Sequence, residues 1–212
     1  MAQPKPAPEV LSSQDVERLT ALIPQLGADN AFVAMGEFSF HGKNSVPFLA
    51  EALKSADSKI RRNAMTVLTW IKDPSSAPAL YEMAMDKTNP SGIRTNALKA
   101  AVSLNSSIAA PSIVAMAKDE NATVRGSAAF WARAVKQQEV LPALVDLLGD
   151  AEMFVTVSAL ASFSILTGFA GTEPHPWNHS FQKDRQKWSQ EFYKWIEDHP
   201  DVFGAAGPKQ AG

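Results

Sequence analysis

The chain has 212 residues, which is enough for one domain or two small ones with a sizeable core. It carries 20 lysines and arginines against 22 aspartates and glutamates, and a net charge of -2 argues against a protein built to bind phosphate backbones. Cysteine is absent, which excludes disulfides, thiolate zinc sites and cysteine nucleophiles.

Residues 1–11 are predicted to form a disordered N-terminal segment. Its first residues, MAQPKPAPE, lack the basic and apolar regions of a signal peptide, but they are typical of the proline-rich start of a mature exported chain. We therefore expect a periplasmic or secreted protein, with a cytoplasmic protein as the alternative. No apolar run approaches the roughly 18 residues that a membrane span requires.

A capping helix is predicted over residues 11–26. Ser12 and Ser13 are suitable N-caps, and Asp15 and Glu17 are favourable in a first helical turn. The helix would turn one apolar face towards the core, formed by Val16, Leu19, Leu22, Ile23 and Leu26.

Two markers then recur with the same period. Alanines at positions 64, 97, 128 and 159 are separated by 33, 31 and 31 residues, and prolines at positions 47, 78, 111 and 142 by 31, 33 and 31. Each unit is predicted to form two helices, the second of which begins at the proline, because proline is tolerated in a first turn. One such pair cannot bury both its faces, but stacked pairs can. We predict an all-α fold, an α-solenoid of about five stacked antiparallel helix pairs.

The units resemble HEAT repeats, including the short variety common in bacterial proteins. The resemblance is carried by 119–128 (DENATVRGSA) and 140–148 (VLPALVDLL), covers about 28–167, and weakens in the first unit and at Thr156, which replaces an arginine. It implies a solenoid but no particular function. It also implies a structural ladder between repeats, formed by the aspartates and arginines of the turns: Asp57, Arg61, Arg94, Asp119, Arg125 and Asp150.

The C-terminal part is predicted to close the stack. A loop over 166–180 leads to a cap helix over 181–197, whose apolar stripe would contain Phe181, Trp188, Phe192 and Trp195, and residues 199–212 form a flexible tail. Residues 12–198 would then form a single domain. His175 and His179 in the loop are possible metal ligands. Because prolines flank His175, the two rings are not expected to share a helix face, and we predict neither a metal nor a cofactor.

No HExxH, GxSxG or nucleotide-binding glycine motif is present, so the chain is predicted to be a non-catalytic scaffold. In HEAT solenoids the second helices line the concave face. Four residues after each proline stand Glu51, Glu82, Ala115 and Asp146, three of them carboxylates. With Phe48 and Tyr81 they are predicted to bind a basic or amphipathic helical segment of a protein or peptide. An ordinary solvated helix face is the other interpretation.

Three alternatives stay open. HEAT-like chromophore lyases share the short repeats, so an enzyme or enzyme accessory of that type is possible, whereas the paired His-Glu motifs of HEAT-like hydroxylases are absent. Nucleic-acid binding, as in HEAT-like DNA glycosylases, is disfavoured by the charge balance. The chain could also be one module of a larger exported protein. The sequence leaves the oligomeric state open.

Overall fold

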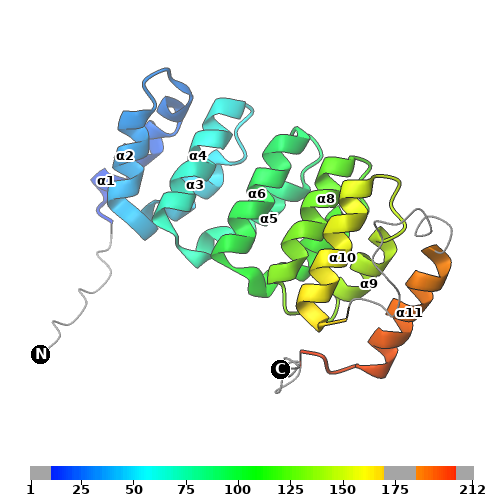
Figure 1. Cartoon of the computed structure of the whole chain (residues 1–212). Coiled ribbons are helices and arrows are strands. Elements are labelled where there is room, and N and C mark those ends of the chain that lie inside the picture. The colour runs from blue at the N-terminus through cyan, green and yellow to red at the C-terminus, as the bar shows by residue number, and fades with distance from the viewer. Residues whose placement is uncertain (1–10, 170–184, 204–212) are drawn as a thin grey trace, which may run out of the picture. The chain divides into compact units, whose positions relative to one another are not determined.

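A computed structural model of the chain describes residues 11–169 and 185–203. Every regular element in these ranges is helical, and the fold is an α-solenoid of HEAT-like helix pairs, as predicted (Figure 1). No helix in the described ranges is both long and apolar enough to cross a membrane. Residues 1–10 and 204–212, which contain most of the predicted terminal segments, lie outside these ranges.

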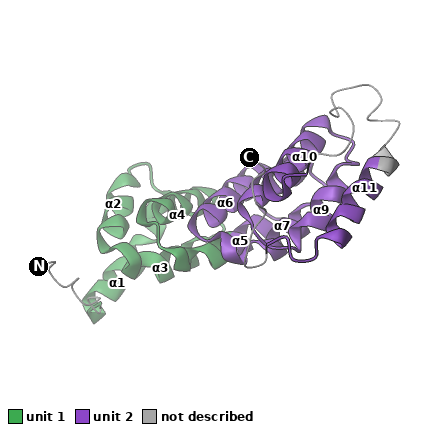
Figure 2. Ribbon diagram, turned by 60° about the horizontal axis from the view of Figure 1, so that its bottom comes forward, with its two compact units in different colours: residues 1–80 green, residues 81–212 purple. Residues whose placement is uncertain are grey.

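Short 3-10 turns precede several of the helices along the chain. The α-helices are α1 (Ser13–Leu22), α2 (Phe32–His41), α3 (Val46–Ala52), α4 (Ser58–Ile71), α5 (Ala77–Met85), α6 (Ser91–Leu104), α7 (Ala110–Met116), α8 (Ala122–Trp131), α9 (Val140–Leu147), α10 (Met153–Thr167) and α11 (Arg185–Asp198). The 3-10 turns are η1 (Pro24–Gly27), η2 (Gly42–Ser45), η3 (Pro74–Ser76), η4 (Ser106–Ile108) and η5 (Ala132–Ala134). Two compact units contain these elements, residues 1–80 and residues 81–212 (Figure 2).

The first unit begins with a well-defined helix start. The Ser12 hydroxyl accepts a hydrogen bond from the Asp15 amide at 3.2 Å, and the Asp15 carboxylate accepts one from the Ser12 amide at 3.2 Å. This reciprocal capping box satisfies two amides that a helix start leaves without partners. Leu19 and Leu26 are buried as predicted, but Val16 is 41% exposed and so does not belong to the buried face.

In the same unit, α4 packs against α2, α3 and η1. Asp57 caps this helix by accepting a hydrogen bond from the Lys59 amide at 2.7 Å. The Asn63 side chain donates to the Leu26 carbonyl at 2.8 Å, which ties the helix to η1. Ala64 is completely buried, as expected for the alanine that recurs once per repeat.

The second unit has two layers, with α6, α8 and α10 in one and α7 and α9 in the other (Figure 2). Ala97, Ala128 and Ala159 are completely buried. Their small side chains let neighbouring helices approach closely. Glycine is used similarly at position 126, where a Cβ atom would lie 2.6 Å from Cε2 of Phe154. The Ser162 hydroxyl donates to the Ala129 carbonyl at 2.6 Å and links α10 to α8.

The end of this unit is covered by α11, which packs against α9. Trp188 and Phe192 are buried as predicted, and the Phe192 ring lies edge-on to Phe163 of α10 with a centroid separation of 4.7 Å. Helix α10 ends at Thr167, followed by Gly168 with a left-handed φ of 74°. Phe181 and most of the predicted 166–180 loop lie outside the described residues.

Candidate functional site

The four second helices of the repeats, α3, α5, α7 and α9, expose the same positions. Each exposes its proline and the residue four positions later, namely Glu51, Glu82, Ala115 and Asp146. Each buries the residue two positions after the proline, namely Leu49, Leu80, Ile113 and Leu144. We call the exposed proline and proline-plus-four positions of each of these helices the second-helix face. Helical periodicity produces it, since residues four apart share one side of a helix.

The carboxylates of this face have different neighbours. Glu51 forms an ion pair with Lys54 at 3.1 Å, and both side chains are well exposed. Such an exposed pair contributes little to stability and is easily exchanged for another partner. The carboxylate of Glu82 has no hydrogen-bond or ion-pair partner within the described part of the chain, whereas its backbone carbonyl is engaged by the Asp86 amide at 3.0 Å. Met85, three residues further along the same helix, is 40% exposed. Glu82 is therefore the carboxylate that is most available to a ligand.

Asp146 has a partner that the sequence analysis did not anticipate. Its Oδ1 atom accepts a hydrogen bond from the hydroxyl of Tyr193 in α11, which also lies 3.5 Å from the Pro142 carbonyl. The carboxylate remains exposed, but one of its oxygens is occupied. Asp146 thus holds the C-terminal helix as well as contributing negative charge to the second-helix face.

Both tyrosines of the chain are expected to ionise at a higher pH than an ordinary tyrosine. Partial burial of Tyr193, which is still 36% exposed, followed by the hydrogen bond and charge of Asp146, raises its pKa to about 12. Burial also raises the pKa of Tyr81 above its ordinary value. Because these pKa values are raised on folding, their contribution to stability is present below the unfolded value of about 10 and is lost as the pH rises through the folded values.

Absorbance titration checks this expectation. The folded protein should show little tyrosinate near pH 10, whereas the protein in urea should titrate there. An Asp146→Asn variant should bring the Tyr193 pKa down and leave the other tyrosine unchanged. A folded wild type in which one tyrosine is half-ionised near pH 10 would contradict the assignment.

Tyr81 is not part of the exposed surface, contrary to its predicted role as a binding anchor. It is only 4% exposed, and its hydroxyl donates to the Asn105 carbonyl at 2.7 Å. The ring is thus packed in the interior, and its hydroxyl is satisfied by the carbonyl of the residue that follows α6. Phe48 in α3 is half-buried, so only part of its ring is available to a partner.

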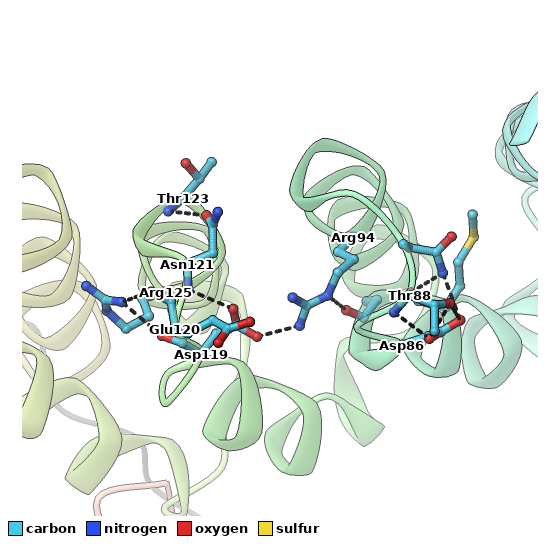
Figure 3. Close-up of polar contacts among 11 residues, drawn as sticks. Asp86, Thr88, Arg94, Asp119, Glu120, Asn121, Thr123 and Arg125 are labelled. Carbon is cyan, nitrogen blue, oxygen red and sulfur yellow. Dashed lines mark hydrogen bonds and ion pairs between the residues drawn. The ribbon is translucent and has the colours of Figure 1, made fainter.

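Arginine and aspartate side chains join consecutive turns of the second unit (Figure 3). Arg94 of α6 and Asp119 are 2.6 Å apart, with side chains only 6% and 2% exposed. Arg94 also donates to the Ala84 carbonyl at 2.9 Å, and Asp119 accepts from the Asn121 amide at 2.9 Å. Burial alone would raise the pKa of Asp119, but the hydrogen bonds from Arg94 and the Asn121 amide outweigh it and hold this pKa below its ordinary value.

The next arginine–aspartate pair has the same arrangement one repeat later. Arg125 contacts both oxygens of Asp150, at 2.6 and 3.0 Å, and its third nitrogen donates to the carbonyls of Asp119 and Glu120 at 2.9 and 3.0 Å. The hydrogen bond with Asp150 raises the pKa of Arg125. In the first unit, Arg61 donates to the carbonyls of its own turn, Ser55 and Ala56. All these contacts are structural, because each guanidinium binds carboxylates or carbonyls of the chain itself.

The possible metal ligands cannot be placed. His175 and His179 lie outside the described residues. Within the described ranges, no three histidine, aspartate or glutamate side chains are grouped so as to hold a metal ion.

One exposed surface was missed in the sequence analysis. Helix α2 exposes three large apolar side chains, Phe32, Val33 and Phe40. The signal was present as FVAMGEFSFH, in which apolar residues are too numerous for a single buried face.

Comparisons with known proteins agree with this architecture. A family model described as HEAT repeats matches residues 28–102. A comparison with curated proteins found no matching sequence. Among solved structures, the complex of CpcE and CpcF of phycocyanin lyase from Nostoc sp. PCC7120 matches with a TM-score of 0.55 and 22% sequence identity, covering 70% of this chain and 99% of that one. This likeness concerns the fold. The chain carries HEAT repeats, and the described helix pairs beyond residue 102 continue the same architecture.

Proposed function

We propose that the chain is a non-catalytic HEAT-repeat scaffold that binds a basic segment of another protein on its second-helix face. The observation that supports this most directly is the recurrence of exposed carboxylates at one repeat position, at Glu51, Glu82 and Asp146. Their common register gives the side chains a shared orientation on their helices. Negative charges that recur in this way attract and orient a lysine- or arginine-rich partner.

The surroundings of these carboxylates suit a helical or extended segment. Pro111 and Ala115 of α7 are exposed at the same register and are small, so they would not obstruct a partner. Met85 beside Glu82 offers an adaptable apolar contact. Since Asp146 already accepts a hydrogen bond from Tyr193, we assign it a supporting role and Glu82 the principal one.

The test compares two variants that make the same change in charge. The first carries Glu51→Gln, Glu82→Gln and Asp146→Asn. The second carries Asp29→Asn, Glu120→Gln and Glu152→Gln, which are exposed carboxylates away from the second-helix face. Exposed ion pairs contribute up to about 1 kcal/mol each, so the first variant should bind the protein partner about tenfold to a hundredfold more weakly than the wild type does.

The second variant should bind almost as well as the wild type, and salt should weaken wild-type binding. Titration calorimetry with the purified partner would measure these differences. Equal binding by both variants would exclude the second-helix face as the site. Unaltered binding at high salt would exclude a basic partner.

An enzyme or enzyme accessory of the lyase type is the second candidate. Its support is the shared fold with the two-protein phycocyanin lyase complex, which also supports a protein partner in general. This candidate predicts that phycocyanin binds to the chain or changes its absorbance on incubation with it. No binding and no spectral change would count against it and would leave the scaffold proposal untouched.

A further inference from the structure

Helix α2 of the first unit carries an unusual apolar surface. Phe40 is 85% exposed, Phe32 78% and Val33 66%, the three highest values among the exposed large apolar side chains of the described residues. Single exposed apolar residues are ordinary in proteins. Three of them within one helix of 10 residues form a patch, and such patches mark interaction surfaces.

A glycine occupies the middle of this patch. Phe32, Gly36 and Phe40 are spaced at intervals of four residues and therefore share one side of the helix. A Cβ atom added at Gly36 would meet nothing within 4 Å, so packing within the described structure does not require the glycine. Glycine in a helix interior costs about 1 kcal/mol relative to alanine. Its place between two exposed rings leaves a notch that admits the backbone of another helix.

The pattern is symmetric about this notch. Read in either direction from Gly36, a phenylalanine follows after four residues. If two copies of α2 cross in antiparallel fashion, a two-fold axis passes between their glycines, and Phe32 of each copy meets Phe40 of the other. We infer that this face of α2 pairs with the same face of a second copy of the chain, forming an isologous dimer.

Charge and area are consistent with self-pairing. Identical faces bring identical charges together, but Glu37, the acidic residue of α2, is already paired with Arg18 at 2.8 Å. Phenylalanine side chains bury about 200 Å² each, so the two rings alone offer roughly 300 Å² of exposed apolar surface per copy. This would form the centre of an interface of about 800 Å² per partner, with polar residues of α1 and α2 at its rim.

The absence of cysteine permits a direct test of the proposed axis. A Gly36→Cys variant should form a covalent dimer under mild oxidation, because the two sulfur atoms would face each other across the axis. Gly92 of α6 is the matched control, since it is also an exposed helical glycine with nothing within 4 Å. Gly92→Cys should remain uncrosslinked under the same conditions. Equal crosslinking of both variants, or of neither, would overturn the inference.

Sedimentation equilibrium supplies the second measurement. The wild type should dimerise across a concentration series, and Gly36→Arg should weaken dimerisation at least tenfold. The monomer should fold at least as well, because arginine is a better helix former than glycine and the space is open. Gly92→Arg should dimerise like the wild type. A wild type that remains monomeric throughout, or a dimer that persists in Gly36→Arg, would overturn the inference. Neither result bears on the second-helix face.

Discussion

Replacing Asp119 by asparagine is expected to lower the free energy of unfolding by about 3–5 kcal/mol. The substitution keeps the size of the side chain and removes its charge, so the guanidinium of Arg94 remains buried without a counter-ion. A buried unpaired charge is among the most destabilising features in a protein interior. Urea unfolding followed by circular dichroism would measure the loss.

Two controls isolate the buried pair. Glu51→Gln removes an exposed pair and should cost less than about 1 kcal/mol. The double variant Arg94→Met with Asp119→Leu leaves no buried charge and should recover part of the loss. If Asp119→Asn proved no more destabilising than Glu51→Gln, the ion pair would not have the structural role that its burial indicates.

Lowering the pH should weaken the same interaction in the wild type. The pKa of Asp119 is held below its ordinary value of 3.8, so its contribution to stability is complete above that value. This contribution is lost as the pH falls through the lower folded-state pKa. Asp119→Asn should therefore lose less stability than the wild type on acidification.

Phe192→Ala should cost about 3–5 kcal/mol and loosen the C-terminal helix. Phe192 is completely buried and contacts the buried ring of Phe163, so its removal leaves a cavity between α11 and α10. Hydrogen exchange of the α11 amides should accelerate more than that of α6, because α11 depends on this contact for its attachment. Differential scanning calorimetry would supply the change in stability.

The matched control for this position is Lys194→Ala on the exposed side of α11. It should change stability by less than about 0.5 kcal/mol. Phe192→Leu should fall between the two, since it keeps most of the apolar volume. If Phe192→Ala left exchange in α11 unchanged, the Phe192 contact would not be what holds the helix in place.

The repeat architecture could be predicted because its markers follow from packing. An alanine is needed wherever first helices approach closely, and the completely buried alanines at 64, 97, 128 and 159 recur for that reason. The prolines are exposed and stand in the first turn of each second helix, where the missing amide has no cost. The register of the second-helix face follows from these prolines and from helical periodicity alone.

The interactions of individual side chains could not be predicted in the same way. Tyr81 stands beside the exposed register, and its burial depends on the Asn105 carbonyl, which lies 24 residues away in sequence. The hydrogen bond between Tyr193 and Asp146 spans 47 residues and requires α11 to dock on α9. Such contacts depend on how elements pack, which a periodic pattern does not specify.

The arginine–aspartate contacts have a consequence for how the chain can change in length. Arg94 and Arg125 each reach an aspartate 25 residues further along, and equivalent residues of the two pairs are 31 positions apart. Deleting 31 consecutive residues, such as 97–127, would bring Arg94 to the same spacing from Asp150. A deletion of any other length would break that match. Gene duplication or loss in steps of one whole repeat is thus the change in length that this network tolerates.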